Sequence, residues 1–396
     1  MPWTEATVID ERVRFVRDFD KYVRSGTMSM SDLCEQYGIA RKTGYKMVHR
    51  RDEGGWPGLA DRSRAPRSGP HWTDSDLVMR VLETRIEFPH WGAETILAYL
   101  QRVDSDQSWP SVSAIHGWLK HAGLVNRRKR RLRFPHPGQP PAVTLGRPNQ
   151  QWSVDFKGQF RTGDRRYCYP LTVADSYSRY LLGCQGLLST SMELVWPVFE
   201  RLFREYGLPE SILSDNGPPF SANSVRRLSK LSVRWIRLGI TPRLIQPGKP
   251  QQNGSHERMH GHMAALVCRE PAANLKGHQS RFDWFVDHYN NVRPHGGCGR
   301  QLPADLYQPS PRPYPNRLPM IDYPSHYEVR RVRSSGEIKW QGQWFFISDV
   351  LIGENIAFEP VAEGCWTIWF GPVDLGYYSS RDRKVHLDRA RADTHN

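Results

Sequence analysis

The sequence predicts a multidomain protein in which two all-α units precede an α/β core with a mixed sheet and a small all-β barrel. A chain of 396 residues is longer than those that usually fold around a single hydrophobic core. The hydrophobic period changes from helical to alternating near residue 150, and short strands punctuated by glycine begin near residue 320. An apolar share of 38% and 14 tryptophans favour folded domains over a disordered chain.

Residues 1–57 are expected to form the first helical unit, because Gly38 separates two helices in a helix–turn–helix arrangement. Lys42, Lys46 and Arg50 recur every four residues on the second of these helices and predict one basic face. A basic face is often only solvated. Its place after a glycine turn in a three-helix unit makes it a candidate for DNA contact.

A linker at 58–73, rich in Pro, Gly and Arg, leads to a second helical unit at 74–125. Three segments with helical periodicity follow one another there, and Ser111 or Ser113 can cap the last of them. Two successive three-helix units indicate tandem DNA-reading helix–turn–helix domains, although small helical units also serve other purposes.

The charge distribution identifies a basic, proline-rich linker at 126–149. The net charge of the chain is +14, and this linker contains seven Lys or Arg residues and no acidic residue. Such a concentration favours a polyanionic partner, most simply nucleic acid. A solvated linker is the alternative interpretation. The clustered cations are Arg127, Arg128, Lys129, Arg130 and Arg131.

The remaining residues predict the α/β core at 150–310, the small barrel at 320–385 and a tail at 386–396. The six cysteines are scattered without a CxxC pair, so a zinc finger or disulfide framework is not expected. No segment has the apolar length of a membrane span, and the N-terminus does not resemble a signal peptide. We therefore expect a cytoplasmic protein.

Three carboxylates in the α/β core are the candidate catalytic groups. Asp155 lies in the strand WSVDF, where apolar neighbours desolvate it, and Asp215 follows a strand in LSDNG. Glu257 falls on the opposite side of its helix from Met259 and the apolar stripe. Alone, these would be a buried aspartate with backbone donors, a turn residue and a solvated glutamate. Asp175, in VADSYSRY, is interpreted as a turn residue.

Taken together, two Asp and one Glu form an oxygen-only ligand set. Such a set suits Mg²⁺ or Mn²⁺, whereas Zn²⁺ prefers His or Cys. Two such ions roughly 3.5–4 Å apart can activate an attacking water or hydroxyl and stabilise the leaving oxygen of a phosphodiester. The basic residues Lys249 and Arg258 flank the third carboxylate and fit an anionic substrate such as DNA.

WSVDF, LSDNGPPF and QQNGSHERMH, followed by HYNNVRPHGGCGRQLPADLY, resemble bacterial insertion-sequence DDE transposases with a retroviral-integrase catalytic core. The resemblance covers nearly the whole chain: paired helix–turn–helix units, a ribonuclease H-like core and a small C-terminal β domain. No His-His-Cys-Cys zinc module precedes the core, which disfavours retroviral integrase proper. The interval between Asp215 and Glu257 contains 41 residues, somewhat more than the compact form of the family.

The resemblance implies that Asp155, Asp215 and Glu257 form a DDE triad that binds two Mg²⁺ ions, for which Mn²⁺ can substitute. It also implies that water cleaves a phosphodiester at the element end and that the freed 3′-hydroxyl attacks target DNA directly.

The implied supporting residues are Asn216 and Gly217, which would shape the loop beside the metals, and Asn253, which would support the helix of the glutamate. The implied partners are double-stranded DNA, as terminal inverted repeats and as target, and further copies of the chain in a synaptic complex at the bacterial nucleoid. No membrane and no small-molecule substrate are expected.

Two alternatives share part of this pattern. An inactive, transposase-derived DNA-binding regulator is disfavoured because all three carboxylates are present. A metal-dependent nuclease without strand transfer has the same triad, but it fits two tandem DNA-reading modules less well.

Overall fold

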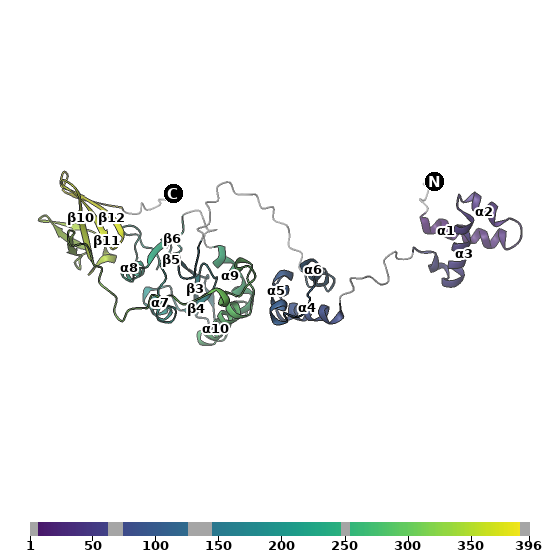
Figure 1. Ribbon diagram of the computed structural model, residues 1–396, viewed down its shortest axis with the longest axis horizontal. Coiled ribbons are helices and arrows are strands. Elements are labelled where there is room, and N and C mark those ends of the chain that lie inside the picture. The colour runs from purple at the N-terminus through teal and green to yellow at the C-terminus, as the bar shows by residue number, and fades with distance from the viewer. Residues whose placement is uncertain (1–6, 62–73, 126–144, 247–253, 389–396) are drawn as a thin grey trace. The chain divides into compact units, whose positions relative to one another are not determined.

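The computed structural model describes residues 7–61, 74–125, 145–246 and 254–388. They divide into two compact units, Met1–Trp72 and Thr73–Asn396 (Figure 1). Within the described ranges, no helix is long and apolar enough to cross a membrane.

The first unit is a small helical domain around one apolar cluster. Gly44 allows α2 and α3 to pack closely, because a Cβ at this position would lie 2.6 Å from Cys34 Sγ. Ser29 caps α2, because its side chain accepts a hydrogen bond from the backbone N–H of Asp32. The Asp32 carboxylate in turn accepts from the backbone N–H of Ser29. The elements are α1 (Val8–Asp18), η1 (Phe19–Val23), α2 (Met30–Gln36), α3 (Arg41–Gly54) and η2 (Trp56–Leu59).

The predicted basic face of α3 is wrong at one of its three positions. Lys42 and Lys46 are exposed, but Arg50 is 8% exposed and its guanidinium donates a 2.6 Å hydrogen bond to the carbonyl of Ala60. A step of four residues advances about 400° around a helix, so each step rotates by about 40° and Arg50 turns away from Lys42. Leu59, expected in the linker, is fully buried in this unit.

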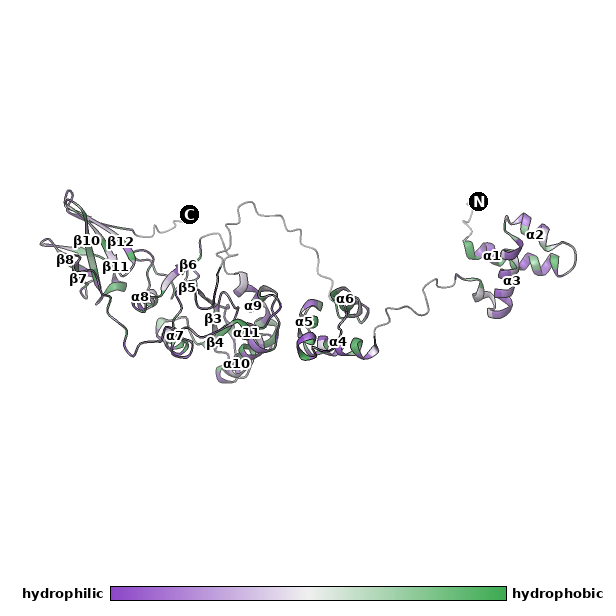
Figure 2. Ribbon diagram, in the orientation of Figure 1, coloured by the Kyte–Doolittle hydropathy of each residue, from purple (hydrophilic) through white to green (hydrophobic). Residues whose placement is uncertain are grey.

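The second unit begins with three helices that form the second predicted helical domain. They are α4 (Ser75–Glu87), α5 (Ala93–Val103) and α6 (Val112–His121). Ser111 caps α6 by accepting from the N–H of Ala114, as one of the two predicted caps. The helices of both N-terminal domains each carry hydrophobic and hydrophilic residues (Figure 2), as expected for amphipathic helices around small cores.

The α/β core is a mixed six-stranded sheet with the order β2-β3-β1-β5-β6, in which β4 also pairs with β3. Its strands are β1 (Trp152–Phe156), β2 (Phe160–Arg161), β3 (Tyr167–Asp175), β4 (Leu181–Leu187), β5 (Ser211–Ser214) and β6 (Thr241–Leu244). β1 pairs antiparallel with β3 but parallel with β5, and β5 pairs parallel with β6. The mixed sheet is therefore confirmed, and the short edge strand β2 was not predicted.

Helices cover both faces of this sheet (Figure 1). α7 (Met192–Tyr206) and α8 (Lys230–Arg237) enclose one apolar cluster with Trp152, Val154 and Ile212. The other face packs against α9 (Gly254–Met263), η4 (Ala264–Cys268) and α10 (Leu275–Asn291). The short elements η5 (Gly296–Cys298) and α11 (Pro303–Leu306) complete the core.

The C-terminal domain is all-β, as predicted, but closure into a barrel is not confirmed. Among the described residues its strands form an open sheet of order β13-β12-β11-β10-β7 and a separate hairpin of β8 and β9. The strands are β7 (Glu328–Arg331), β8 (Glu337–Trp340), β9 (Gln343–Phe346), β10 (Asn355–Ala362), β11 (Cys365–Phe370), β12 (Val373–Ser379) and β13 (Lys384–Leu387), with η6 (Asp349–Leu351) before β10. β13 extends into the first residues that were predicted as tail.

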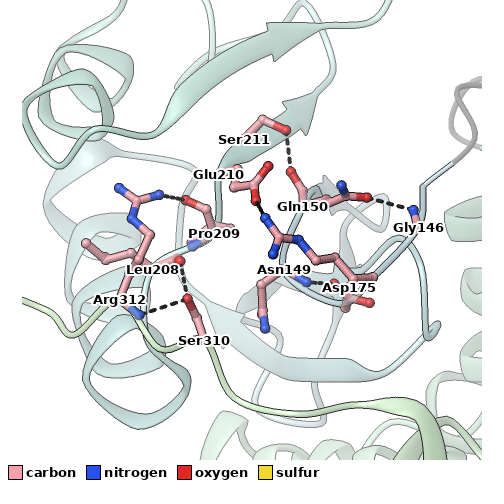
Figure 3. Close-up of polar contacts among 11 residues, drawn as sticks. Gly146, Asn149, Gln150, Asp175, Leu208, Pro209, Glu210, Ser211, Ser310 and Arg312 are labelled. Atoms are coloured by element: carbon pink, nitrogen blue, oxygen red, sulfur yellow. Dashed lines mark hydrogen bonds and ion pairs between the residues drawn. The ribbon is translucent and has the colours of Figure 1, made fainter.

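Asn149 ties the two ends of the α/β core together. Its Oδ1 accepts from Trp152 Nε1 and Tyr307 Oη, at 2.9 Å each, and its Nδ2 donates to the carbonyl of Gln308. Its backbone N–H donates to the Asp175 carboxylate, as Figure 3 shows. The φ of 64° favours asparagine at this position. Nearby, Arg312 donates to the carbonyl of Pro209 (Figure 3), so the segment after α11 is held against the sheet.

Replacing Asn149 by Ala should lower the free energy of unfolding by about 1–3 kcal/mol, because it leaves the buried Trp152 N–H without an acceptor. Urea unfolding followed by tryptophan fluorescence measures this. Asn291→Ala, at an exposed position of α10, is the matched control and should change the value by less than about 0.5 kcal/mol. Equal effects of the two substitutions would contradict the role of Asn149.

Candidate active site and DNA-contacting residues

The pairing of β1 with β5 aligns two of the three predicted carboxylates. Trp152 is opposite Ile212 and Ser153 is opposite Leu213. The same register continued by two residues places Asp155 beside Asp215, at the carboxyl ends of neighbouring strands that are about 4.8 Å apart.

Both aspartates lie on the α9 side of the sheet. Trp152, Val154 and Ile212 enter the cluster under α7 and α8, and successive residues of a strand point to opposite faces. Asp155 is one residue after Val154, and Asp215 is three residues after Ile212. Both therefore point to the opposite face, which is covered by α9. Asp155 retains a side-chain exposure of 19%, so the carboxylate is accessible from this side.

The loop after β5 holds Asp215 in a partly buried position. Its Oδ1 accepts from the backbone N–H of Gly217 at 3.3 Å, and a Cβ at Gly217 would lie 3.3 Å from its Oδ2. Asn216 donates from Nδ2 to the carbonyl of Ile245, which connects the loop to the end of β6. Burial raises the pKa of Asp215, against the opposing effect of the Gly217 N–H. Asn216 and Gly217 both make hydrogen bonds in this loop, and their role beside a metal stays a prediction.

α9 is anchored to β1 and β3 through Thr172 and His260. Thr172 pairs with Asp155 in the sheet, and its Oγ1 donates to the Asp155 carbonyl at 3.0 Å. The same oxygen lies 2.8 Å from His260 Nε2, and His260 Nδ1 lies 3.9 Å from Asp155 Oδ2. Burial lowers the pKa of His260 to about 3, so the ring is neutral at pH 7 and the contact with Asp155 is not an ion pair.

Neither Thr172 nor His260 was predicted as a site residue. His260 occurs three residues after Glu257 in SHERMH, which is the only sequence signal for its role. No sequence pattern identifies Thr172, because its role follows from strand pairing.

The structure carries Glu257 on the helix whose His260 contacts Asp155, but it does not complete a metal site. Glu257 is exposed on the first turn of α9, and Met259 and Met263 are buried, as the predicted stripe requires. His260 is less than one turn further along the helix, a rise of about 4.5 Å. In the described part of the chain, no three His, Cys, Asp or Glu side chains are positioned to hold one metal ion.

The aspartates fit a hard divalent cation. Both present carboxylate oxygens at one edge of the sheet, which is the donor type that Mg²⁺ and Mn²⁺ prefer. The raised pKa of Asp215 shows that its charged form is poorly stabilised by the protein alone. A bound cation would reverse this shift, because opposite charge favours the carboxylate form.

Some of the other predicted site residues lie within the described ranges, and others lie outside them. Arg258 is exposed on α9. Asp175 accepts three hydrogen bonds, from the N–H of Asn149 and from the N–H and Oγ of Ser178, and so acts in the turn before β4 as predicted. The predicted residues outside the described ranges are Arg127, Arg128, Lys129, Arg130, Arg131, Lys249 and Asn253.

Comparison with family models identifies the central domain. Two models described as "Integrase core domain" match residues 146–250 and 238–303. The chain carries an integrase core. A model described as "Helix-turn-helix domain" matches residues 12–67, and one described as "Homeodomain-like domain" matches 43–119, so this integrase core follows helical domains of the helix–turn–helix type.

Proteins of bacterial insertion elements are similar to the chain. The "Insertion element IS476 uncharacterized 39.2 kDa protein" of Xanthomonas euvesicatoria is 29% identical over 50% of this chain and 56% of its own length. The "Insertion element IS407 uncharacterized 31.7 kDa protein" of Burkholderia multivorans is 25% identical over 70% of this chain and 94% of its own length. "Transposase InsD for insertion element IS2A/D/F/H/I/K" of Escherichia coli is 24% identical over 60% of this chain and 80% of its own length.

Solved integrase structures show a weaker likeness. The HTLV-2 integrase catalytic core domain in complex with magnesium covers 41% of this chain and 98% of its own, with 14% identity and a TM-score of 0.33. A simian T-cell lymphotropic virus intasome chain covers 79% of this chain and 99% of its own, with 14% identity and a TM-score of 0.37. With TM-scores this low, the assignment rests on the family models and the sheet topology. The chain is thus similar in sequence to insertion-element proteins, one of which is named a transposase, and its central region matches the integrase core models.

Replacing both Lys42 and Lys46 by Ala should weaken binding to double-stranded DNA and reduce the slope of log affinity against log salt by about 2. Arg50→Ala should instead destabilise the first unit by about 1–3 kcal/mol, because the Ala60 carbonyl loses its donor. Fluorescence anisotropy at several salt concentrations and thermal unfolding separate the two effects. Unchanged binding by the double-lysine variant would mean that this face is only solvated.

The integrase core should lose stability on acidification through His295. Burial lowers its pKa to about 3 from 6.5, with Arg293, His262 and Arg179 adding to this and the Tyr289 carbonyl opposing it. The stability is fully present above pH 6.5 and is lost as the pH falls toward 3, by up to about 1.4 kcal/mol per pH unit.

His295→Gln should reduce that slope in urea unfolding between pH 7 and pH 5. Substitution of the exposed His326 by Gln should leave the slope unchanged. An unaltered slope in His295→Gln would show that other groups cause the acid sensitivity.

Proposed function

We propose that this protein is a DNA transposase that binds the terminal inverted repeats of an insertion sequence, cleaves a phosphodiester at each element end and joins the 3′-hydroxyl to target DNA. The observation that carries the proposal is the register of β1 and β5, which aligns Asp155 with Asp215 at the carboxyl edge of an integrase core. The insertion-element proteins to which the chain is similar support the same activity.

Asp155, Asp215 and Glu257 are proposed as the ligands of two Mg²⁺ ions, for which Mn²⁺ can substitute. The metal pair supplies Lewis-acid stabilisation of the attacking and leaving oxygens of the phosphodiester. Glu257 completes the set from the first turn of α9, and the contact of His260 with Thr172 holds the second turn of that helix beside Asp155.

The reaction consists of two displacements at phosphorus. In the first, a water oxygen forms a bond to phosphorus and the bond to the 3′-oxygen of the element end breaks, which leaves a free 3′-hydroxyl. In the second, that hydroxyl attacks a phosphodiester of the target, so one P–O bond forms as another breaks and no residue of the protein becomes covalently attached.

The helix–turn–helix domains and the predicted basic linker at 126–149 are proposed to bind double-stranded DNA, the former at the element ends. Phosphate contacts position such domains, whereas contacts to base edges select the sequence. Two element ends must meet for transposition, so we propose that the protein acts as a homo-oligomer in the synaptic complex.

Glu257→Gln should bind element-end DNA with unchanged affinity but should neither nick it nor join it to a target in Mg²⁺. The amide keeps the shape of the side chain and removes the charge that a divalent cation requires. A strand-transfer assay with labelled DNA from the flanks of the coding sequence measures both steps. Glu270→Gln, at an exposed position after η4, is the control and should join ends normally. Strand transfer by Glu257→Gln would exclude this residue from the site.

A further inference from the structure

Three motifs of the integrase core each contain one arginine without an assigned structural role. Arg179 occurs in VADSYSRY, Arg258 in SHERMH and Arg293 in YNNVRPH. They come from the turn after β3, the first turn of α9 and the segment that follows α10. These three elements meet around Tyr289.

The turn after β3 packs against the loop that follows α10. Cys298 Sγ donates to the carbonyl of Ser178 at 3.1 Å, and a Cβ at Gly297 would lie 3.5 Å from Arg179 Nε. Arg179 itself has a φ of 65°, so its side chain leaves the turn in a direction that an extended residue could not provide.

Tyr289 connects this loop to α9. The ring centroids of His295 and Tyr289 are 4.2 Å apart, and His295 Nε2 is 3.0 Å from the Tyr289 carbonyl oxygen. On its other side Tyr289 belongs to the same buried cluster as Met259 and Met263. Arg258 directly precedes Met259, so the cluster fixes the position of its backbone.

The positive charges at this junction have no ion-pair partner among the described residues. Arg179, Arg258 and Arg293 form no ion pair within the residues that the structure describes, and the buried Nε of Arg293 has no hydrogen-bond partner. Other arginines of the same compact unit are paired, such as Arg204 with Glu200 at 2.6 Å.

Electrostatic effects on Tyr289 agree with this grouping. Burial raises the pKa of Tyr289 to about 12, and the three arginines each oppose the shift, so all three are close enough to act on one hydroxyl. Burial also lowers the pKa of Arg293, and Tyr289 opposes this shift.

We propose that Arg179, Arg258 and Arg293 form a binding site for the backbone phosphates of DNA. Arg179 and Arg293 are partly buried and Arg258 is exposed beside them. A partly buried guanidinium without a counter-ion favours an anion, and its planar fork matches the oxygens of a phosphate. Arg258 adjoins Glu257 on α9, so the phosphates held here flank the bond to be cleaved. The identification of the ligand as DNA rests on the proposed function.

The test is binding of the full-length protein to a duplex from the flank of its coding sequence, in EDTA so that no cleavage occurs. Arg179→Gln, Arg258→Gln and Arg293→Gln should each reduce the slope of log affinity against log salt by about 0.9. Arg204→Gln removes an exposed, ion-paired arginine and should leave the slope unchanged.

Neutral methylphosphonate linkages, placed one at a time beside the cleavage position, locate the contact. At the position that Arg258 contacts, the linkage should weaken binding of the unaltered protein and should have no further effect on Arg258→Gln. A full additional loss in that variant, or a slope that matches Arg204→Gln, would overturn the proposal. Because Arg258 is exposed, its variant provides this test even if Arg293→Gln fails to fold.

The two proposals fail in different ways. These binding measurements contain no metal and no strand transfer, so they do not depend on the triad. If Glu257→Gln still joins ends but Arg258→Gln has the reduced salt slope, the phosphate site is retained and the proposed catalytic residue is lost.

Discussion

The parallel pairing of β1 with β5 is the constraint on which the candidate active site depends. Asp155 and Asp215 are 60 positions apart in the chain, and only this register brings them together. A slip by one residue would send one aspartate to the opposite face of the sheet. The buried side chains of Trp152, Val154 and Ile212 prevent such a slip, because each would have to leave the cluster under α7 and α8.

The placement of α9 follows from that sheet. Met259 and Met263 pack into the second apolar cluster, and Thr172 joins the Asp155 carbonyl to His260. The helix is thereby attached to the strand that carries the first aspartate. Its glutamate stands on the exposed side, where it can approach cations and DNA, because a helix that is apolar on one stripe leaves the opposite side to solvent.

Positive charge in this protein has two different uses. Arginines such as Arg50, Arg237 and Arg312 donate to carbonyl or carboxylate oxygens and hold loops against the domains. Lys42 and Lys46 are exposed, and three arginines around Tyr289 lack an ion-pair partner among the described residues. The net charge of +14 therefore does not identify the cations that are available for a polyanion, because pairing decides which of them remain.

The sequence by itself determined the order of domains, the mixed α/β core and the amphipathic side of α9, because these follow from hydrophobic period and from short turn and capping motifs. It also identified the three carboxylates as separate candidates, and its resemblance to a family joined them. Only the tertiary structure decided that Arg50 is a buried donor to Ala60, that Asp155 and Asp215 are neighbours, and that Thr172 and His260 contact Asp155. Those facts depend on strand register and on packing between distant segments, and local periodicity contains no information about either.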